Sequence, residues 1–237
     1  MGELIIKERD IVVPGEVLAK GMDFLPAFGT IRRGDDVVAI KVGLASIEGR
    51  AVKIIPLSGQ YMPKKDDVII AKISEVGMTN WRINTFCMYP AMLPLSEGSS
   101  DFIPRGANLA KYYSIGDYIV TQITKVTSQK LVDITMKGPG LRKLGPGRIF
   151  KVNAYKVPRI IGKRGSMVSM IKQATGVRIT VGQNGIIWLS GEDPDMEMLA
   201  YDTIKKIESE AHKAGLTDAI KAYLEEKTGK KLSIETH

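Results

Sequence analysis

The residues Gly162-Lys163-Arg164-Gly165, followed at once by Ser166, have types and a spacing that suit contact with phosphate groups. Gly162 and Gly165 carry no Cβ atom, so a phosphate-bearing chain can approach their backbone closely. We expect Ser166 to cap a helix, whose first N–H groups and positive end favour a phosphate. Lys163 and Arg164 add two positive charges to the same turn. The sequence therefore predicts a phosphate-binding loop at this point.

The segment around this loop carries all of the chain's excess positive charge. The 237 residues have a formal net charge of +8. Residues 134–191 hold eleven Lys and Arg and no Asp or Glu, while the remainder holds 23 basic and 26 acidic residues. Such a concentrated field attracts polyanions, with nucleic acid as the first candidate and an anionic membrane as the second. The eleven basic residues are Lys137, Arg142, Lys143, Arg148, Lys151, Lys156, Arg159, Lys163, Arg164, Lys172 and Arg178.

Few residues are available for catalysis, metal binding or disulfides. Cys87 is the only cysteine, which excludes an internal disulfide and favours a reducing, cytoplasmic location. With His212 and His237 it leaves almost nothing for a zinc site or a histidine-dependent nucleophile. The pairs Asp35-Asp36 and Asp66-Asp67 stand beside Gly or Lys and are expected to be solvated turns rather than metal ligands. We therefore expect no catalytic residue, metal or cofactor, and no membrane span because the apolar stretches are short.

The chain divides into three predicted domains. Residues 1–62 contain short apolar runs separated by Gly and Asp turns, which indicate a small β domain. Residues 63–137 contain five strand patterns, with a short helical stretch before the fourth, which is the order of an OB-fold barrel. A Gly- and Pro-rich linker is expected over 138–146, followed by a third domain over 147–237. The predicted fold class is therefore multidomain, β-rich and then α+β.

Strands and helices are mixed in the third domain. A strand precedes the glycine loop, and a helix with an apolar face follows it. Gly176 ends this helix, and Asn184-Gly185 forms a tight turn between two further strands. Two C-terminal helices follow, of which the last is capped by Thr217 and ends near Gly229. The final eight residues are expected to be frayed.

This order of elements resembles a KH domain of the eukaryotic arrangement. The resemblance rests on Ile160-Ile161 and the glycine loop, together with Thr175-Gly176, Asn184-Gly185 and Trp188 downstream. KH domains clamp about four nucleotides with this loop, and the bases lie on an apolar groove beside it. In the alternative, the domain is a packing element and its loop touches protein. The RNA contacts that the resemblance implies are Gly162, Lys163, Arg164 and Gly165, with Arg159 and Ile160 before them and Ile161 and residues 177–181 completing the groove.

The middle domain resembles an S1 domain, an OB-fold that binds single strands by stacking bases on aromatic rings. Typical S1 domains place two aromatics and a histidine on that face, and the matching positions here are Met78, Trp81 and Pro94. Trp81 alone of these can stack a base. Arg82, next to it in sequence but on the opposite face of the strand, is a second candidate RNA contact in this domain. In the alternative, Trp81 is a core or interface residue. Phe86 and Tyr89 are near enough in sequence to compensate.

The N-terminal segment extends the resemblance to nearly the whole chain. Val12-Val13-Pro14-Gly15-Glu16 and the short β repeats precede an S1-like and then a KH-like domain. This arrangement is similar to that of the archaeal RNA-binding cap subunits of the exosome, the ribosomal RNA-processing protein four family. The resemblance implies a non-catalytic subunit, three copies of which cap a hexameric ring of RNase PH-like subunits through their N-terminal domains. It also implies that single-stranded RNA, including A-rich tails, is recruited and fed to the ring for 3′-to-5′ degradation.

Two other classes of function compete with this hypothesis. Polynucleotide phosphorylase also combines S1 and KH domains, but it places KH before S1. It also needs two additional RNase PH-like domains, for which this chain has no room, so an enzyme is not expected. An S1-KH RNA-binding factor that acts in translation or ribosome assembly is the alternative.

Overall fold

The computed structural model describes residues 2–104, 106–211, 213 and 215–229. The chain forms two compact units, Met1–Gly59 and Gln60–His237, which are described separately below. The first unit therefore ends three residues before residue 62, where the first predicted domain ends. His212, His237 and the predicted frayed end at 230–237 lie outside the described residues. Within the described part, each helix is too short or too polar to cross a membrane.

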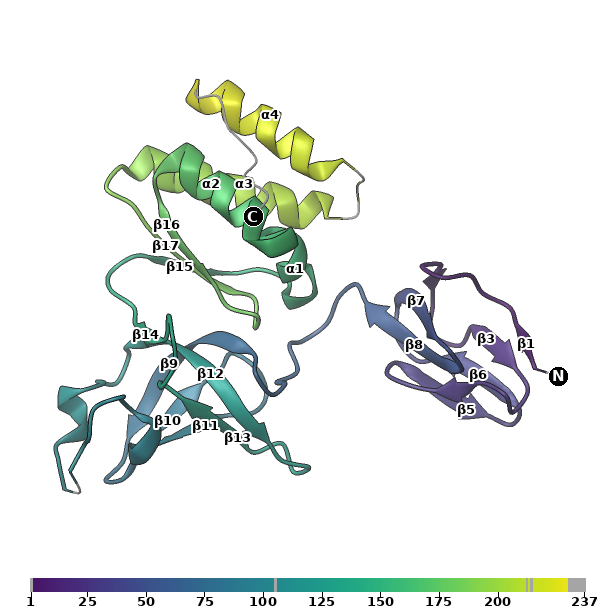
Figure 1. The fold of residues 1–237 in the computed structure, drawn as a ribbon, viewed down its shortest axis with the longest axis horizontal. Helices are drawn as coiled ribbons and strands as arrows, with labels where there is room; N and C mark the ends of the chain where they lie inside the picture. Colours follow the sequence, from purple (N-terminus) through teal and green to yellow (C-terminus); the bar gives the residue numbers. More distant parts are fainter. Residues whose placement is uncertain (1, 105, 212, 214, 230–237) are drawn as a thin grey trace. The chain divides into compact units, whose positions relative to one another are not determined.

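The first unit is a small β domain, as predicted. Its strands form two four-stranded sheets, in the orders β1-β3-β6-β5 and β2-β7-β8-β4 (Figure 1). Val12, Leu18, Val37 and Val52 lie in the core between them and are fully buried. The bounds are β1 Glu3–Leu4, β2 Ile11–Val12, β3 Val17–Lys20, β4 Leu25–Pro26, β5 Thr30–Arg33, β6 Asp36–Ala39, β7 Gly43–Glu48 and β8 Ala51–Pro56.

The second unit begins with a closed five-stranded barrel, which confirms the predicted OB-like fold. Each strand pairs with two others, and the parallel β11–β13 pairing together with the antiparallel β12–β13 pairing closes the ring. A short 3₁₀ helix, η2 (Leu109–Lys111), precedes the fourth strand, as predicted. The strands are β9 Val68–Val76, β10 Asn80–Asn84, β11 Ala91–Pro94, β12 Tyr118–Val126 and β13 Val132–Thr135.

The predicted linker at 138–146 is anchored to the barrel. It contains β14 (Arg142–Lys143), which pairs with Ile119 and Val120 of β12. Leu144 is buried, and the ammonium of Lys143 forms an ion pair with the Asp117 carboxylate. The Gly- and Pro-rich composition therefore marks a tight connection here rather than a free spacer.

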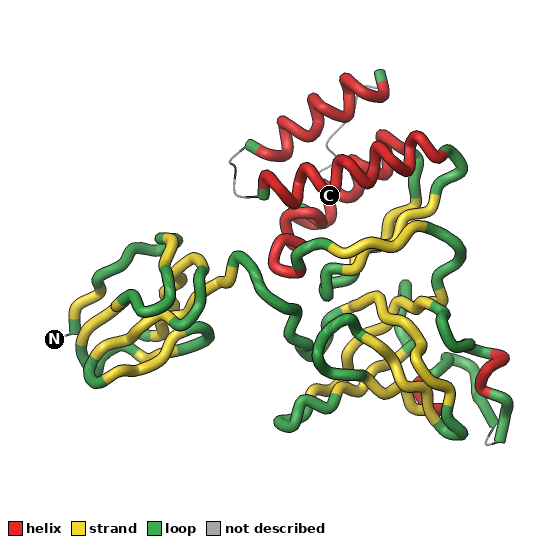
Figure 2. The backbone as a smooth tube through the Cα atoms, turned by 180° about the vertical axis from the view of Figure 1, so that it is seen from behind, coloured by secondary structure: helices red, strands yellow, loops and turns green. Residues whose placement is uncertain are grey.

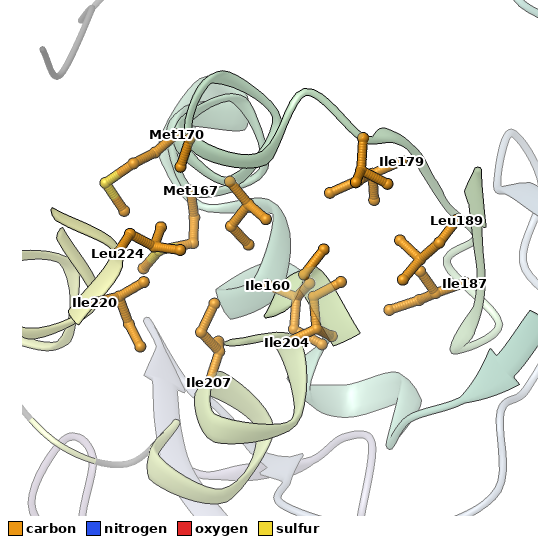
Figure 3. Close-up of a cluster of buried hydrophobic side chains, with 14 of the residues drawn as sticks. Ile160, Met167, Met170, Ile179, Ile187, Leu189, Ile204, Ile207, Ile220 and Leu224 are labelled. Atoms are coloured by element: carbon orange, nitrogen blue, oxygen red, sulfur yellow. The ribbon is translucent and has the colours of Figure 1, made fainter. Parts of the chain in front are cut away.

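The remainder is a KH domain with an added C-terminal helix. Its antiparallel sheet has the order β15-β17-β16, and Figure 2 shows the helices gathered on one side of it. Figure 3 shows the core that these helices form with the sheet, where side chains from α2, α3, α4 and the strands meet. The elements are β15 Arg148–Lys151, α1 Val157–Ile161, α2 Ser166–Thr175, β16 Arg178–Val181, β17 Ile186–Ser190, α3 Pro194–Glu210 and α4 Leu216–Thr228.

Two predicted helix caps are wrong. Ser166 is the first helical residue of α2, and the cap position is taken by Gly165 in the left-handed conformation, with no side-chain cap. Thr217 lies inside α4, whose cap position is taken by Gly215. In both cases the residue before the helix has a positive φ. Glycine adopts this backbone conformation readily, whereas Ser and Thr rarely do. The predicted helix ends at Gly176 and Gly229 are correct.

A further small core joins the KH sheet to the barrel. Successive residues of β17 face opposite sides, so Ile187 and Leu189 pack under the helices while Ile186 and Trp188 pack against the barrel. The barrel contributes Ile70 and Val120 to this second contact. Both faces of the KH sheet are thus covered, which makes the barrel and the KH domain one compact unit.

Candidate nucleic-acid interface

The glycine loop is an exposed turn between two helices. Gly162 follows α1 at φ 76° and ψ 173°, and Gly165 precedes α2 at φ 83°. A Cβ on Gly162 would lie 2.7 Å from the backbone nitrogen of Met167, so only glycine fits there. A Cβ on Gly165 would meet no atom within 4 Å, so that side of the loop is open to an approaching chain.

The middle of the loop presents positive charge to solvent. Lys163 and Arg164 are both exposed, and Arg164 has a left-handed backbone with φ 53°. Arg159 is exposed on α1, just before the loop. Among the described residues, neither Arg159 nor Lys163 takes part in an ion pair. The first N–H groups of α2 add the partial positive charge of a helix start. The loop can therefore hold a phosphate through backbone and side chains together.

One predicted RNA contact of the KH domain is wrong. Ile160 is fully buried in the helix core and points into the cluster drawn in Figure 3. Its neighbour Ile161 is half-buried, so one residue of the Ile-Ile pair faces inward and the other lies toward the surface. Thr180 and Val181 of β16 are also half-buried. Arg178 of the same strand is exposed. Thr180 lies opposite Trp188 on the barrel-facing side of the sheet, and the guanidinium of Arg142 donates to its hydroxyl at 3.3 Å. Ile161 and Val181 are therefore the apolar residues of the predicted groove that a base can reach.

The expected stacking role of Trp81 is also wrong. Its side chain is 0% exposed, and its indole N–H donates to the carbonyl oxygen of Tyr113 at 3.2 Å. The Tyr113 ring packs edge-on against it with centroids 5.3 Å apart, and Gly98 lies against its outer edge. A ring enclosed in this way cannot stack on a base. Trp81 is a core residue of the barrel.

The other barrel residues considered for RNA contact have different positions. Arg82 is exposed, as expected from strand alternation, and its guanidinium lies 3.2 Å from the Glu75 carboxylate. Phe86 stacks on Tyr118 beside the core that joins barrel and KH domain. Tyr89 packs against the barrel core. Both rings are half-buried, so a compensating role for either of them in stacking a base stays a prediction.

The sequence reasoning missed the residue that joins the two domains. The side-chain amide of Asn184 is buried and donates to the carbonyl oxygens of Ile70 and Thr85, at 2.8 and 2.9 Å. Its side-chain oxygen accepts from the Ile70 N–H at 3.3 Å. Gln183 adds a backbone and a side-chain hydrogen bond to Val68. The two loop residues thus dock on strand β9 and on the residue that follows β10.

The run of apolar residues in β17 is a sequence signal for this docking. Residues 186–189 are four consecutive apolar residues in a short strand. An unbroken apolar strand indicates a sheet that is covered on both faces. The predicted helices cover only one face of the KH sheet, so the pattern required a second partner, and that partner is the barrel.

Acidic and metal-ligating groups do not gather at this interface. In the part of the chain that the structure describes, no group of three or more His, Cys, Asp or Glu is placed to hold a metal ion. Asp67, from one predicted acidic turn, accepts a hydrogen bond from the Tyr61 hydroxyl at 2.6 Å. Burial and this carboxylate raise the pKa of the Tyr61 hydroxyl. Tyr61 and Asp67 therefore stabilise the start of the barrel domain.

Comparison with known proteins agrees with this geometry. A family model described as KH domain matches residues 147–195. Exosome complex component Rrp4 from Methanothermus fervidus is 40% identical over 222 residues, which cover 93% of this chain and 97% of that protein. The chain belongs to the Rrp4 family of exosome components. Members from Pyrococcus abyssi and Thermofilum pendens are 39% and 37% identical; each match covers 94% of this chain, and 85% and 95% of the relatives.

The structural comparison agrees with the Rrp4 assignment. A crystal structure described as an exosome complex RNA-binding protein superposes with a TM-score of 0.62 and is 32% identical in sequence. The superposition covers 71% of this chain and 97% of that one. The predicted family and fold class are thus confirmed for this member of the Rrp4 family.

Proposed function

We propose that this Rrp4-family chain is a non-catalytic, RNA-binding subunit of an exosome. In this proposal it caps a ring of RNase PH-like subunits, as one of three copies, and passes single-stranded RNA to the ring. The observation that carries the proposal is the exposed glycine loop, with Lys163 and Arg164 beside the start of α2, in a chain of an exosome family. A location in the cytoplasm and a preference for A-rich tails belong to the same proposal.

The glycine loop is suited to binding RNA of any sequence. Phosphates are common to every nucleotide, so contacts from the open side of Gly165 and from Lys163 do not depend on the base. Arg159 and the half-buried Ile161 and Val181 lie on neighbouring elements, where bases can rest. A subunit that feeds many different RNAs to an enzyme needs this kind of contact.

The N-terminal unit has an apolar face that suits docking on a protein. Ile11, Leu44 and Ile55 pair directly across β2, β7 and β8, so they form one row on the same face of the sheet. Ile11 is 69% and Ile55 is 49% exposed, whereas their neighbours Val12 and Ile54 face the core. Exposed apolar rows of this kind mark contacts with other proteins. We place the contact with the ring here.

A preformed turn lies beside this row. Val13 is exposed, and its N–H donates to the Glu16 carboxylate at 3.0 Å. Gly15 adopts φ 93° and donates its N–H to the Ala39 carbonyl. Pro14 fixes its own φ, so the turn keeps one shape before any partner binds. This supports the hypothesis that the Val13-Pro14-Gly15 turn shapes the contact with the ring.

The proposal is tested by changing each surface separately in the full chain. Lys163→Asp with Arg164→Asp should weaken binding of labelled single-stranded RNA and flatten its log–log salt dependence by about 0.7 per lost phosphate contact. The same variant should still join purified ring subunits in light scattering. Ile11→Asp with Ile55→Asp should do the reverse, binding RNA normally but failing to join the ring.

The same mixtures test whether the chain is catalytic. The chain alone, with phosphate and magnesium present, is expected to leave the RNA at full length, and the ring is expected to shorten it. RNA shortening that follows the purified chain through further columns would contradict a non-catalytic role. If the loop variant binds RNA as well as the wild type does, the glycine loop does not contact RNA and must contact another partner.

A further inference from the structure

The barrel has a hollow that none of the contacts described so far occupies. It has a volume of about 640 Å³ and lies between the end of β11 and the long loop that follows it. Its walls include Leu95, Ser96, Ser100, Phe102, Ile103 and Lys137. This volume is within the range of about 300–1,000 Å³ that small-ligand pockets span.

Phe102 is exposed although the loop that carries it is held in place. Its side chain is 88% exposed, whereas the next residue, Ile103, is buried in the barrel core. At the start of the loop, the Gly98 carbonyl accepts from the Tyr113 hydroxyl at 2.8 Å. A Cβ on Gly98 would lie 2.7 Å from the Trp81 ring, so the loop packs tightly at that point. The fold therefore presents an aromatic ring to solvent from a fixed base.

The polar groups of the hollow match the parts of a nucleotide. The Lys137 ammonium is 3.7 Å from the Glu97 carboxylate, a loose ion pair that leaves it able to meet a phosphate. Glu97 is itself fixed by the Thr135 hydroxyl at 2.6 Å, which keeps this wall in place. Ser96 and Ser100 offer hydroxyl groups. Asp101, the acidic residue of the lining, offers an acceptor for a base amino group.

We propose that this hollow is a second RNA contact, in which one unstacked base lies on Phe102 and the adjoining phosphate meets Lys137. The proposal rests on the RNA-binding function proposed above and gives the barrel its own part in it. It also replaces the buried Trp81 with a ring that a base can reach. Stacking on an aromatic ring tolerates any base, which suits a chain that binds RNA of varied sequence.

The test uses fluorescence and affinity in the full chain. Phe102→Ala should weaken binding of a short single-stranded RNA by about 5- to 150-fold, the range for losing one base–aromatic stack. Phe102→Trp should keep the affinity, and RNA should quench its emission, because Trp81 and Trp188 are buried and report little. Lys137→Gln should reduce the log–log salt slope by about 0.7.

Leu131 provides the matched control. It is 59% exposed on the same barrel, at the opposite end of β13 from Lys137. Leu131→Ala should leave RNA affinity unchanged, and the emission of Leu131→Trp should not respond to RNA. The proposal is overturned if Phe102→Ala binds like the wild type and Phe102→Trp does not respond to saturating RNA. It is equally overturned if that emission responds only to ring subunits, since the hollow then contacts protein. Failure of the wild-type chain to bind RNA would overturn the proposed function itself.

Discussion

The KH domain contains two four-residue loops with glycine at both ends, and they face different partners. Gly162-Lys163-Arg164-Gly165 is exposed and positively charged. Gly182-Gln183-Asn184-Gly185 lies against the barrel, with Asn184 buried. Glycine gives each loop its backbone shape, and the two middle residues decide the partner. Cations at these positions suit phosphate, whereas amides suit the backbone groups of a strand.

The comparison bears on the alternative that this KH domain is only a packing element. Packing against the barrel is present, but the second loop and β17 provide it. The Lys163-Arg164 loop lies at the start of α2, on the helical side of the sheet. Docking and an exposed glycine loop thus occur together in one domain, and neither excludes the other.

The largest expected effect comes from the docking loop. Asn184→Ala removes three hydrogen bonds and leaves backbone groups of Ile70 and Thr85 without partners in a buried place. We expect it to lower the free energy of unfolding by about 3 kcal/mol or more. Gln183→Ala, in an exposed side chain, should cost only about 1 kcal/mol. Denaturant titration of both variants checks the difference, and equal costs would contradict the central place of Asn184.

The two glycines of the exposed loop should differ in an informative way. Gly162→Ala would place a Cβ against Met167 at a φ and ψ that only glycine adopts, so we expect a loss of about 2–3 kcal/mol in stability. Gly165→Ala meets open space and should lose only about 1 kcal/mol, from its left-handed backbone.

RNA affinity separates these two variants further. The added methyl group at residue 165 would stand on the open side of the loop, where a phosphate is expected to approach. Gly165→Ala should therefore weaken RNA binding in a protein that is still folded. Thermal unfolding and RNA titration of the same samples give both quantities. Normal RNA affinity would mean that RNA approaches from elsewhere.

The smallest effect concerns two lysines of the basic segment. Lys143 is paired with Asp117, and Lys163 has no ion pair within the described part of the chain. Lys143→Ala should lower stability by about 0.5 kcal/mol at neutral pH, because the pair is partly solvated. Lys163→Ala should leave stability unchanged but reduce the RNA salt slope by about 0.7.

The pH dependence checks the first of these assignments. Burial raises the pKa of the Asp117 carboxyl, but hydrogen bonds from Lys143 and the Ser114 N–H outweigh burial and leave the pKa below its ordinary value. A lowered native pKa stabilises the fold above the ordinary carboxyl pKa, and this contribution is lost as pH falls through the native value. The stability difference between wild type and Lys143→Ala should therefore vanish at acidic pH. A difference that persists there would indicate lost packing instead.

Much of the fold was predictable because its signals are local. Gly162 and Gly165 mark a turn into a helix, Gly176 marks a helix end, and five short strands with a helix before the fourth indicate a barrel. The RNA contacts of Arg159, Lys163 and Arg164 remain predictions.

The errors at the candidate site concern which way a side chain faces. Ile160 and Ile161 have the same chemistry, and only the packing of α1 against the core of the KH domain decides that Ile160 is inside. Trp81 stands in a suitable position for stacking, but Tyr113, from a distant part of the sequence, encloses it. Asn184-Gly185 has the sequence of a tight turn, and that sequence is the same whether water or another strand lies beside the turn. These outcomes depend on residues far along the chain, which local patterns do not contain.

The small core of Ile70, Val120, Leu144, Ile186 and Trp188 has a consequence for how this chain can change in evolution. It belongs to both the barrel and the KH domain, so a recombination event that exchanged one of them would expose half of it to water. Only a replacement with a matching apolar surface would be soluble. Barrel and KH domain are therefore expected to be inherited as a pair, whereas the N-terminal unit, with its own core, can diverge or be replaced alone.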